Sequence, residues 1–589
     1  MKLNNYAPNV FTRLLCLGMH SMPSISREDL EGPKIDRRTT MKLLGSAGIG
    51  SLMAGCTGGD ETEASGQMQS GGSITAGWLT DAIENLDPHQ VELATEIEIQ
   101  SNIFSGLTKL NNDIEITGDA AKDWSLPDET TYVFQLHDGI TFHNGDPLDA
   151  QAAKESIERL QGFEASSHIG KVEQIEEIEA DGRELTIHLA NPVSPFISFM
   201  LRGPGRAGTI VHAETAEEDP DEYTRSPIGS GPFQVTDRVS GQSLTLERFD
   251  DYWETDDDGN QLPYLDQIDL ELIPEPSTIW SAIQGDTVQY INSITGDFAQ
   301  QAEEAGNLEV ILTSSGEFTG LAPLCNKPHE HEEAAKFASG FDEITNKWEG
   351  KDLPTEDKRV RQALAMAIDR EQLVENAWFG YAAPAHTLYN PAIKWLYEPL
   401  GGEEPDPGQY YDPDRAEELL DEAGYTGDPR LEFDVLALPE DQRELTVVQQ
   451  QWRDIGVEIE LDIQQQSSYW DQTYRYEHTA IRYGGGADID PWMSHFKQFG
   501  SPDPETSRGS WQRSLYFNEE YDELLMKDYR TPDREERSKI LTEANKVFAN
   551  DPPFLTTTFP LTPKVMDSSL KDVGAQAALS NFHYAHIND

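Results

Sequence analysis

"LEFDVLALPEDQRELTVVQQQWRDIGVEIELDI", residues 431–463, has the pattern of a strand, a helix and a second strand. We expect strands over 431–438 and from residue 457, with a helix over roughly 440–454 between them. The second strand alternates apolar and polar residues, as a half-buried strand does. Its apolar positions are Val457, Ile459, Leu461 and Ile463. Strands joined by such a crossover are usually parallel and right-handed, so this stretch predicts an α/β fold.

The same two patterns recur along the chain. Residues 131–136 and 183–189 alternate like half-buried strands. Residues 357–380 carry an apolar stripe at helical spacing and predict two helices, and residues 411–425 predict another. The expected ends of these helices are Asp369 and Gly380 in the first stretch and Asp412 and Gly424 in the second. Strands and helices therefore alternate through the body of the protein.

The composition is strongly acidic. Among 589 residues, Lys and Arg number 44 and Asp and Glu number 106, a formal net charge of −62. Such a surface repels nucleic acid and anionic lipid. Because 37% of the residues are hydrophobic, we expect a folded protein rather than a disordered one. Salt would screen its self-repulsion, and the composition resembles that of proteins from extremely halophilic archaea.

The N-terminal region is predicted to be an export signal. Arg37 and Arg38 precede an apolar run from Met41 to Gly55, which is too short to span a bilayer. The paired arginines fit a twin-arginine signal, and the residues up to Cys56 resemble a lipobox, in which the cysteine thiol takes a lipid. Residues 1–56 are therefore expected to be a lipoprotein signal region, and the Gly- and Ser-rich residues 57–72 a flexible tether.

Other motifs point away from catalysis. The Gly-x-Gly-x-x-Gly at 203–208 has no convincing helix after it and is interpreted as a glycine loop. Residues 327–333, "KPHEHEE", could hold a metal, but we interpret them as an exposed polar loop. Cys325 is expected to be a small buried residue. No phosphate-binding loop, zinc-protease helix or nucleophile elbow is found, so we expect no enzyme, no metal site and no cofactor.

Several stretches, taken in order, resemble one family. Residues 71–89 contain a Leu-Asp-Pro turn, 123–160 a strand and a His/Asn-Gly turn before a helix, and 226–254 a Pro-Ile-Gly-x-Gly-Pro segment. With the helices of 357–371 and 411–425, they are similar to the peptide/nickel-type solute-binding proteins of ABC importers, family 5 of the extracellular solute-binding proteins. The similarity runs from about residue 71 to about residue 560. The family's Gly-x-x-Asp turn near residue 285 is altered here.

The resemblance implies a periplasmic-binding-protein-like α/β fold of type II, similar to cluster C. Two lobes would close by a hinge over a ligand held between them. The domains it implies are lobe I (71–113, 226–318 and 555–589), an inserted domain II (114–225) and lobe III (319–554).

The implied ligand site lies in "AIRYGGGADIDPWMSHF", residues 480–496. In peptide-binding relatives the matching segment presents a carboxylate to the peptide ammonium, a charge that must be paired when buried. Asp488 is our candidate, and Asp490 is the alternative; either could instead belong to the acidic surface. The further candidates are Trp492 as aromatic surface in the cleft, Tyr483 and Trp78 on the cleft walls, and Arg482 for a ligand carboxylate. Trp492 could equally be a core residue, and Arg482 could form a surface ion pair.

The resemblance implies a binding protein that captures oligopeptides or dipeptides outside the cell and delivers them to an ABC permease. It would be a monomer, bound to the outer face of the membrane only through a lipid on Cys56. A nickel chelate or an oligosaccharide remains an alternative cargo, and an extracellular hydrolase or a sensory binding protein remains an alternative function.

Overall fold

The computed structural model describes residues 71–91, 93–111, 114–314, 316–400, 410–485, 489–574 and 579–588. Every element below belongs to the unit Ala64–Asp589. The predicted signal residues Arg37, Arg38 and Cys56 lie outside the described residues. Within the described ranges, no helix combines the length and the hydrophobicity needed to cross a bilayer.

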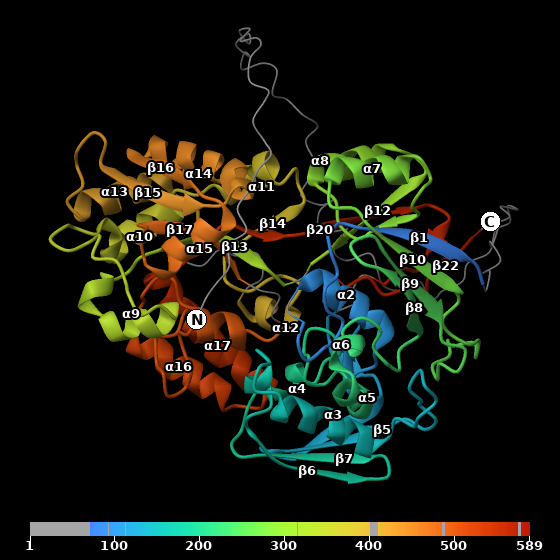
Figure 1. The fold of residues 1–589 in the computed structure, drawn as a ribbon. Coiled ribbons are helices and arrows are strands. Elements are labelled where there is room, and N and C mark those ends of the chain that lie inside the picture. Colours follow the sequence, from blue (N-terminus) through green and yellow to red (C-terminus); the bar gives the residue numbers. More distant parts are fainter. Residues whose placement is uncertain are drawn as a thin grey trace, which may run out of the picture. The chain divides into compact units, whose positions relative to one another are not determined.

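The first sheet has seven strands. Their order across the sheet is β12 (Leu308–Thr313), β20 (Thr562–Asp567), β11 (Tyr290–Ile291), β1 (Ser73–Trp78), β10 (Gln267–Leu272), β9 (Ser243–Arg248) and β8 (Phe233–Val239). β1 pairs in parallel with β10, whereas β12 and β20 are antiparallel. Helices α7 (Pro276–Gln284) and α8 (Gly296–Glu304) lie beside this sheet and share a hydrophobic core with β11 and β20 (Figure 1).

The second sheet has five strands and contains the predicted crossover. Their order is β16 (Val457–Ile463), β15 (Leu431–Ala437), β17 (Ala480–Gly485), β13 (Phe318–Pro323) and β18 (Leu555–Thr556). β15 and β16 run parallel, from Leu431 opposite Val457 to Ala437 opposite Ile463, and α14 (Gln442–Asp454) connects them. Leu445, Val448 and Trp452 of α14 are completely buried in the core of this sheet. The strand–helix–strand prediction is confirmed.

The third sheet has four antiparallel strands. Their order is β4 (Ala121–Asp128), β5 (Thr131–Leu136), β7 (Glu184–Leu189) and β6 (Ile175–Asp181). The alternating positions Tyr132, Phe134 and Leu136 of β5 and Leu185, Ile187 and Leu189 of β7 are buried, as predicted for half-buried strands. They share a hydrophobic core with α3 (Ala150–Gly162), and this core takes side chains from Leu107 to Ile210. We call residues 107–210 the four-stranded module.

The predicted helices form, and the N-terminal caps expected at Asp369 and Asp412 are present, but the helix expected to end at Gly380 ends earlier, at Ala377. Residues 357–380 contain α10 (Lys358–Met366) and α11 (Arg370–Ala377), and the Asp369 side chain accepts a hydrogen bond from the Gln372 amide at 3.0 Å. The predicted stripe is almost fully buried, at Val360, Ala363, Leu364, Ala367 and Ile368. In α13 (Pro413–Glu422), Asp412 caps the Arg415 amide at 2.9 Å, and Gly424 takes a positive φ of 96° just after the helix.

The remaining described elements are further helices and two-stranded pairs. The other helices are α2 (Ala94–Ile103), α4 (Phe196–Phe199), α5 (Ala213–Glu218), α6 (Pro220–Tyr223), α9 (Glu332–Ser339), α12 (Lys394–Tyr397), α15 (Gln466–Tyr474), α16 (Glu519–Tyr529) and α17 (Arg534–Asn550). Two-stranded pairs are β2 (Thr108–Leu110) with β3 (Ile116–Gly118), β14 (Ala382–Pro384) with β19 (Thr558–Pro560), and β21 (Leu570–Lys571) with β22 (His586–Ile587).

Three expectations about single motifs can be compared with the structure. Cys325 is 3% exposed, which confirms a buried thiol, and burial raises its pKa to about 12. The loop at 203–208 is a series of turns, and Gly208 packs so closely that a Cβ would lie 1.8 Å from the Met200 carbonyl oxygen. The 327–333 stretch is not an open loop, because Pro328–Glu330 form a short 3-10 helix and α9 begins at Glu332.

The sheets draw on separate parts of the chain. The seven-stranded sheet combines residues 73–78, 233–313 and 562–567, and the four-stranded sheet lies within 121–189. The five-stranded sheet uses residues 318–485 and also β18 at 555–556, so the returning chain crosses from it to the seven-stranded sheet after residue 556. The predicted domain boundaries stay a prediction.

Candidate functional site

The predicted ligand segment follows a central strand. β17 lies between β15 and β13, and ends at Gly485. A Cβ at Gly485 would lie 1.9 Å from the Phe318 ring, so this glycine is needed for packing inside the protein. Asp488 lies outside the described residues. The chain is described again from Ile489 and forms a π-helical turn over Trp492–Lys497, a feature often found at functional sites.

Asp490 is held by an arginine of α17. Its two carboxylate oxygens accept hydrogen bonds from Arg537 Nη1 at 2.6 Å and Nη2 at 2.8 Å, and Oδ1 also accepts from the Trp492 amide at 3.1 Å. Arg537 binds a second carboxylate, Asp528, through Nε at 2.9 Å and Nη2 at 3.2 Å. Asp490 therefore points at Arg537, and its charge is already paired.

The electrostatics of this cluster follow from burial. The Asp490, Arg537 and Asp528 side chains are only 11%, 5% and 5% exposed. Burial raises the pKa of Asp528 to about 6, although Arg537 acts in the opposite direction. Burial also disfavours charged Arg537, but Asp490 and Asp528 outweigh it and raise its pKa above the usual range. We call these three residues the Arg537 cluster.

Trp492 packs between two parts of the protein. Its ring lies 5.3 Å from that of Phe199 in α4, and 6.0 Å from those of Phe496 and Tyr529. Lys497 Nζ lies 4.9 Å from the ring centre. Trp492 and Tyr529 both cover the core of the four-stranded module, although they belong to the chain around the five-stranded sheet. Trp492 is thus half-buried at a contact between the two.

Arg482 is engaged in a buried ion pair. Its guanidinium lies 3.2 Å from Asp441 and 2.7 Å from Glu444 (Nη1 to Oδ1 and Nη2 to Oε2), and the three side chains are at most 13% exposed. Burial disfavours the charged arginine, but the two carboxylates raise its pKa. The expected alternative, an ion pair, is therefore formed, but it is internal rather than on the surface. A ligand carboxylate would have to compete with Asp441 and Glu444 for the Arg482 guanidinium.

The two other aromatic candidates differ in exposure. Tyr483 of β17 is half-buried, packs near Trp470 with ring centres 6.4 Å apart, and has a pKa that burial raises. Trp78, at the end of β1, is completely buried. Its indole N–H donates to the Thr95 carbonyl at 3.2 Å, and its ring lies 6.4 Å from that of Tyr290. Trp78 is a core residue in this conformation.

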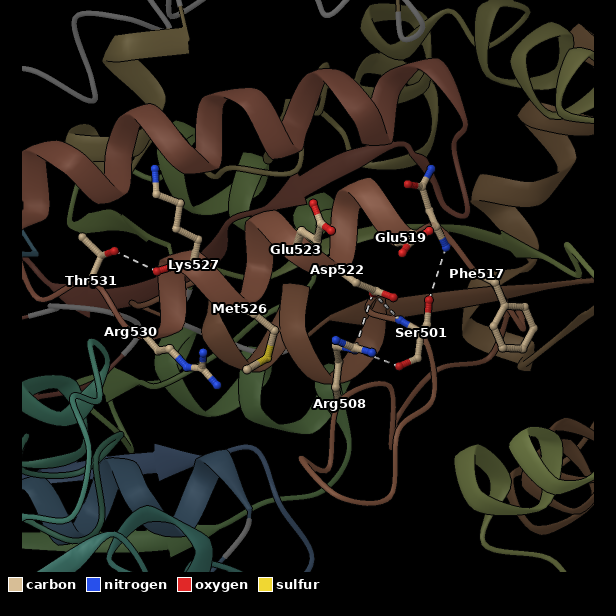
Figure 2. A pocket seen from close by; sticks show the side chains of 11 residues that line it. Ser501, Arg508, Phe517, Glu519, Asp522, Glu523, Met526, Lys527, Arg530 and Thr531 are labelled. Atoms are coloured by element: carbon tan, nitrogen blue, oxygen red, sulfur yellow. Dashed lines mark hydrogen bonds and ion pairs between the residues drawn. The ribbon is translucent and has the colours of Figure 1, made fainter.

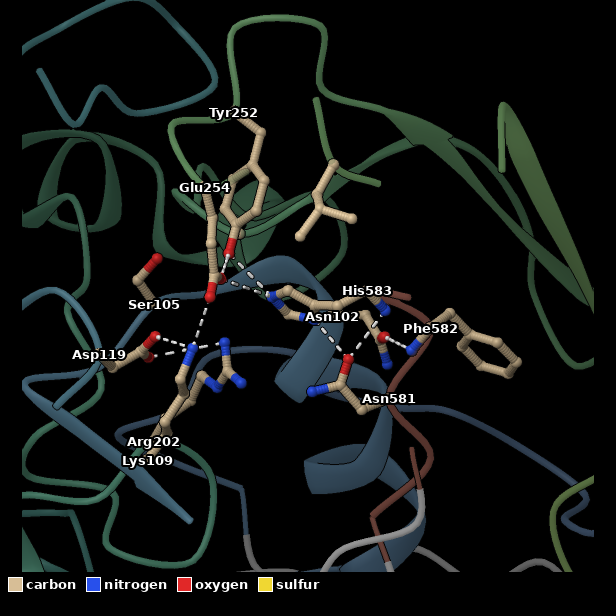
Figure 3. Close-up of polar contacts among 12 residues, drawn as sticks. Asn102, Ser105, Lys109, Asp119, Arg202, Tyr252, Glu254, Asn581, Phe582 and His583 are labelled. Atoms are coloured by element: carbon tan, nitrogen blue, oxygen red, sulfur yellow. Dashed lines mark hydrogen bonds and ion pairs between the residues drawn. The ribbon is translucent and has the colours of Figure 1, made fainter. Parts of the chain in front are cut away.

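A second polar cluster was missed by the sequence reasoning. Lys109 Nζ lies 3.0 Å from Glu254 and 3.6 Å from Asp119, whose side chain is fully buried, and Arg202 Nη1 lies 3.5 Å from Asp119. The Tyr252 hydroxyl lies 2.8 Å from Glu254 and from His583 (Figure 3). The set is Lys109, Asp119, Arg202, Tyr252, Glu254 and His583, which we call the Lys109 cluster. No local pattern could have predicted it, since its members lie far apart in sequence.

The surface hollows among the described residues include one of about 790 Å³ and one of about 820 Å³. The first lies along α16, where Arg508 contacts Asp522 and Ser501 (Figure 2). The second lies between α3 and α5. Neither is lined by a predicted ligand residue, and neither combines residues of the seven- and five-stranded sheets. No group of three or more His, Cys, Asp or Glu in the described ranges has an arrangement suited to a metal ion.

Comparison with known proteins adds the family. The model of "Bacterial extracellular solute-binding proteins, family 5 Middle" matches residues 115–507. The glutathione-binding protein GsiB of Salmonella paratyphi A is 24% identical over 489 residues, covering 80% of this chain and 86% of its own. The nickel-binding periplasmic protein of Escherichia coli K12 is 25% identical over 417 residues, covering 67% and 72%.

Solved structures agree on the fold. CtaP of Listeria monocytogenes, an ABC transporter substrate-binding protein, superposes with a TM-score of 0.73 at 21% identity, over 88% of this chain and 100% of its own. DppA of Helicobacter pylori, in complex with the peptide STSA, has a TM-score of 0.67 at 20% identity, over 88% and 99%. The predicted binding-protein-like α/β fold is confirmed.

Proposed function

We propose, from the premise that this chain belongs to the extracellular solute-binding proteins of family 5, that it is the substrate-binding component of an ABC importer. It captures oligopeptides or dipeptides outside the cell and delivers them to a membrane permease. No bond is broken in this process, so the protein is not an enzyme. Affinity comes from closing the lobes over the ligand and replacing its water shell with protein groups.

One observation carries the proposal. The fold extends over 99–100% of the length of solved binding proteins, and among these are DppA in complex with a tetrapeptide and AppA of Bacillus subtilis in complex with a nonapeptide. The family also includes a glutathione-binding and a nickel-binding protein. A nickel chelate is therefore the second candidate cargo, whereas an oligosaccharide stays an alternative from the sequence alone.

Within this function, Asp488 is the proposed partner of the peptide ammonium. Asp490, the alternative, is less suited, because both of its oxygens already bind Arg537. Arg482 is likewise paired with Asp441 and Glu444. Tyr483 and Trp492 supply aromatic surface to the ligand. Trp78 is completely buried, so it would support the cleft wall without touching the ligand.

The proposed location is the outer face of the cell membrane. Arg37 and Arg38 direct export, Cys56 carries the lipid, and residues 57–72 form the tether. The charge of −62 fits a protein that works as a monomer in concentrated salt. Mass spectrometry of protein purified from its native source would identify both the N-terminal lipid and any retained cargo; an unmodified Cys56 would reject the anchor.

The cargo is tested by calorimetry at about 2 M KCl. The probes are the peptide Ser-Thr-Ser-Ala, its N-acetylated form, glutathione, a nickel–histidine complex and a maltooligosaccharide. Binding of the free peptide at least roughly tenfold tighter than the acetylated one is expected, since a buried ammonium is paired with a carboxylate. A peptide cargo would be rejected if none of the peptides gave binding heat while the chelate or the sugar bound.

The ammonium partner is tested with matched variants. Asp488→Asn should remove the difference between the free and the acetylated peptide. Asp490→Asn is the control, and should keep that difference because its carboxylate belongs to Arg537. If Asp490→Asn instead removes the difference while Asp488→Asn keeps it, the assignment is reversed.

A further inference from the structure

The four-stranded module is joined to its two neighbours in different ways. The chain enters it from α2 and leaves it toward β8, so both chain connections lead to the seven-stranded sheet. Backbone hydrogen bonds reinforce this joint, among them Ile210 N to Ser105 O at 3.0 Å and His143 N to Gly229 O at 2.8 Å. This side of the module is therefore bound by covalent connections and by backbone hydrogen bonds.

The Lys109 cluster lies at the same joint. Lys109, Asp119 and Arg202 come from the module, whereas Tyr252, Glu254 and His583 come from segments packed with the seven-stranded sheet (Figure 3). The Asp119 side chain is fully buried and Arg202 is 6% exposed. Removing one partner from a buried ion pair leaves a charge without its counter-charge, which is strongly unfavourable. We therefore expect the module and the seven-stranded sheet to move as one body.

The contact between the module and the segments packed around the five-stranded sheet, which we call the five-stranded side, differs from this joint. No chain connection leads directly from the module to that side. Trp492 and Tyr529 cover the core of the module, with Trp492 against Phe199, and the Ser194 amide donates to the Tyr529 carbonyl at 2.9 Å. Aromatic contacts of this type are individually weak. A movement between the parts would break this contact before the joint on the other side.

Trp492 has an indole N–H without a hydrogen-bond partner in the described part of the chain, and its backbone lies on a rigid turn. Its indole N–H is buried without a hydrogen-bond partner among the described residues, although buried indole N–H groups usually find one. The Arg537 cluster holds its turn, since Asp490 accepts the Trp492 amide at 3.1 Å and is itself fixed by Arg537. The ring is thus presented by a rigid turn to a surface that need not stay in contact.

We propose that Trp492 is a closure latch: its ring, which packs beside Tyr529, seats against Phe199 when the four-stranded module meets the five-stranded side, and separates from Phe199 when the protein opens. The proposal rests on the proposed binding function, because it assigns the contact to the closed form. It gives the four-stranded module a role, which is to carry the surface against which the five-stranded side closes. Arg537 acts through Trp492 as a positioning residue.

The test measures the two joints separately by spin labels and pulsed electron resonance. One pair joins the module to the five-stranded side, at Glu177→Cys and Lys539→Cys, and the other joins it to the seven-stranded sheet, at Glu177→Cys and Asp237→Cys. These positions are exposed. Cys16 and Cys56 are changed to Ser in the full chain, and buried Cys325, with a pKa raised to about 12, stays unlabelled.

Trp492→Ala should shift the Glu177–Lys539 distances toward longer values, in the ligand-free or the peptide-saturated protein. The expected change in the ratio of short to long distances is roughly twofold to tenfold, the effect of losing the Trp492–Phe199 pair, which crosses the contact. The Glu177–Asp237 distances should not change. Trp511→Ala is the matched control: Trp511 is exposed and also lies over Lys497, but is not part of the module contact.

Unchanged Glu177–Lys539 distances in both states of Trp492→Ala would overturn the latch, and so would an equal effect of Trp511→Ala. If Trp492→Ala does not fold, Trp492→Phe gives the decision, because it keeps a smaller ring and should show a shift in the same direction. A shift in a protein that binds none of the peptides supports the latch and rejects the peptide cargo. Tight peptide binding without any shift of the Glu177–Lys539 distances rejects the latch and supports the peptide cargo.

Discussion

Replacing Arg537 with Met is expected to destabilise the protein strongly. The substitution removes the only cation that the four hydrogen bonds of the Arg537 cluster share, at 2.6–3.2 Å, and leaves two carboxylates that are 11% and 5% exposed. Removing one partner of a buried pair costs about 3–5 kcal/mol. We therefore expect the free energy of unfolding to fall by about 3–5 kcal/mol near pH 7.5.

The loss should shrink in acid, and its sign follows from the raised pKa of Asp528. That pKa is about 6 in the folded protein, against an ordinary value of 3.8. The folded state therefore binds more protons than the unfolded state between these values, so this group adds stability as the pH falls through that window and loses it as the pH rises. Arg537 lowers the pKa of Asp528, so without Arg537 this pKa rises further, and protonation relieves more of the repulsion. We expect the loss to be smaller by at least about 1 kcal/mol near pH 5.

Urea unfolding at constant salt, followed by tryptophan fluorescence, measures this loss at both pH values. The control on the same helix is Lys539→Met, whose side chain is 71% exposed and pairs with Glu535 on the surface. Such a pair contributes roughly 0–1 kcal/mol. A loss below about 1 kcal/mol for Arg537→Met, or a loss that is independent of pH, would refute the reasoning.

Three further predictions concern packing, reactivity and salt. Gly485→Ala should destabilise the protein by about 1–3 kcal/mol in urea unfolding, because its Cβ would lie 1.9 Å from the Phe318 ring. Gly484→Ala should destabilise it less, because the atom nearest to its Cβ lies at 3.4 Å. Equal losses for the two variants would contradict this. Cys325 should react with a thiol reagent only after unfolding, since it is 3% exposed and its pKa is raised to about 12; rapid labelling of the native protein would show that the region opens. Lowering the salt from about 2 M to about 0.1 M should lower the melting temperature, because the charge of −62 is then less screened; a higher melting temperature in low salt would contradict this.

The binding-protein fold was predictable because its signals are local or follow in order along the chain. The alternation in β5 and β16 and the stripe of α10 each depend on which residues share a face within a few positions. The candidate site was predictable only as a segment. The glycines before Asp490 suggested room for a ligand, but at Gly485 that room is taken by the Phe318 ring.

The sequence by itself determined where several helices begin, since caps such as Asp369 and Asp412 act on backbone amides only a few residues away. Only the tertiary structure decided which charges are already paired. Asp490 meets Arg537 47 positions further along the chain, and Glu254 meets Lys109 145 positions before it. The physical reason is that electrostatic attraction and burial depend on distance through space, which the order of residues does not give.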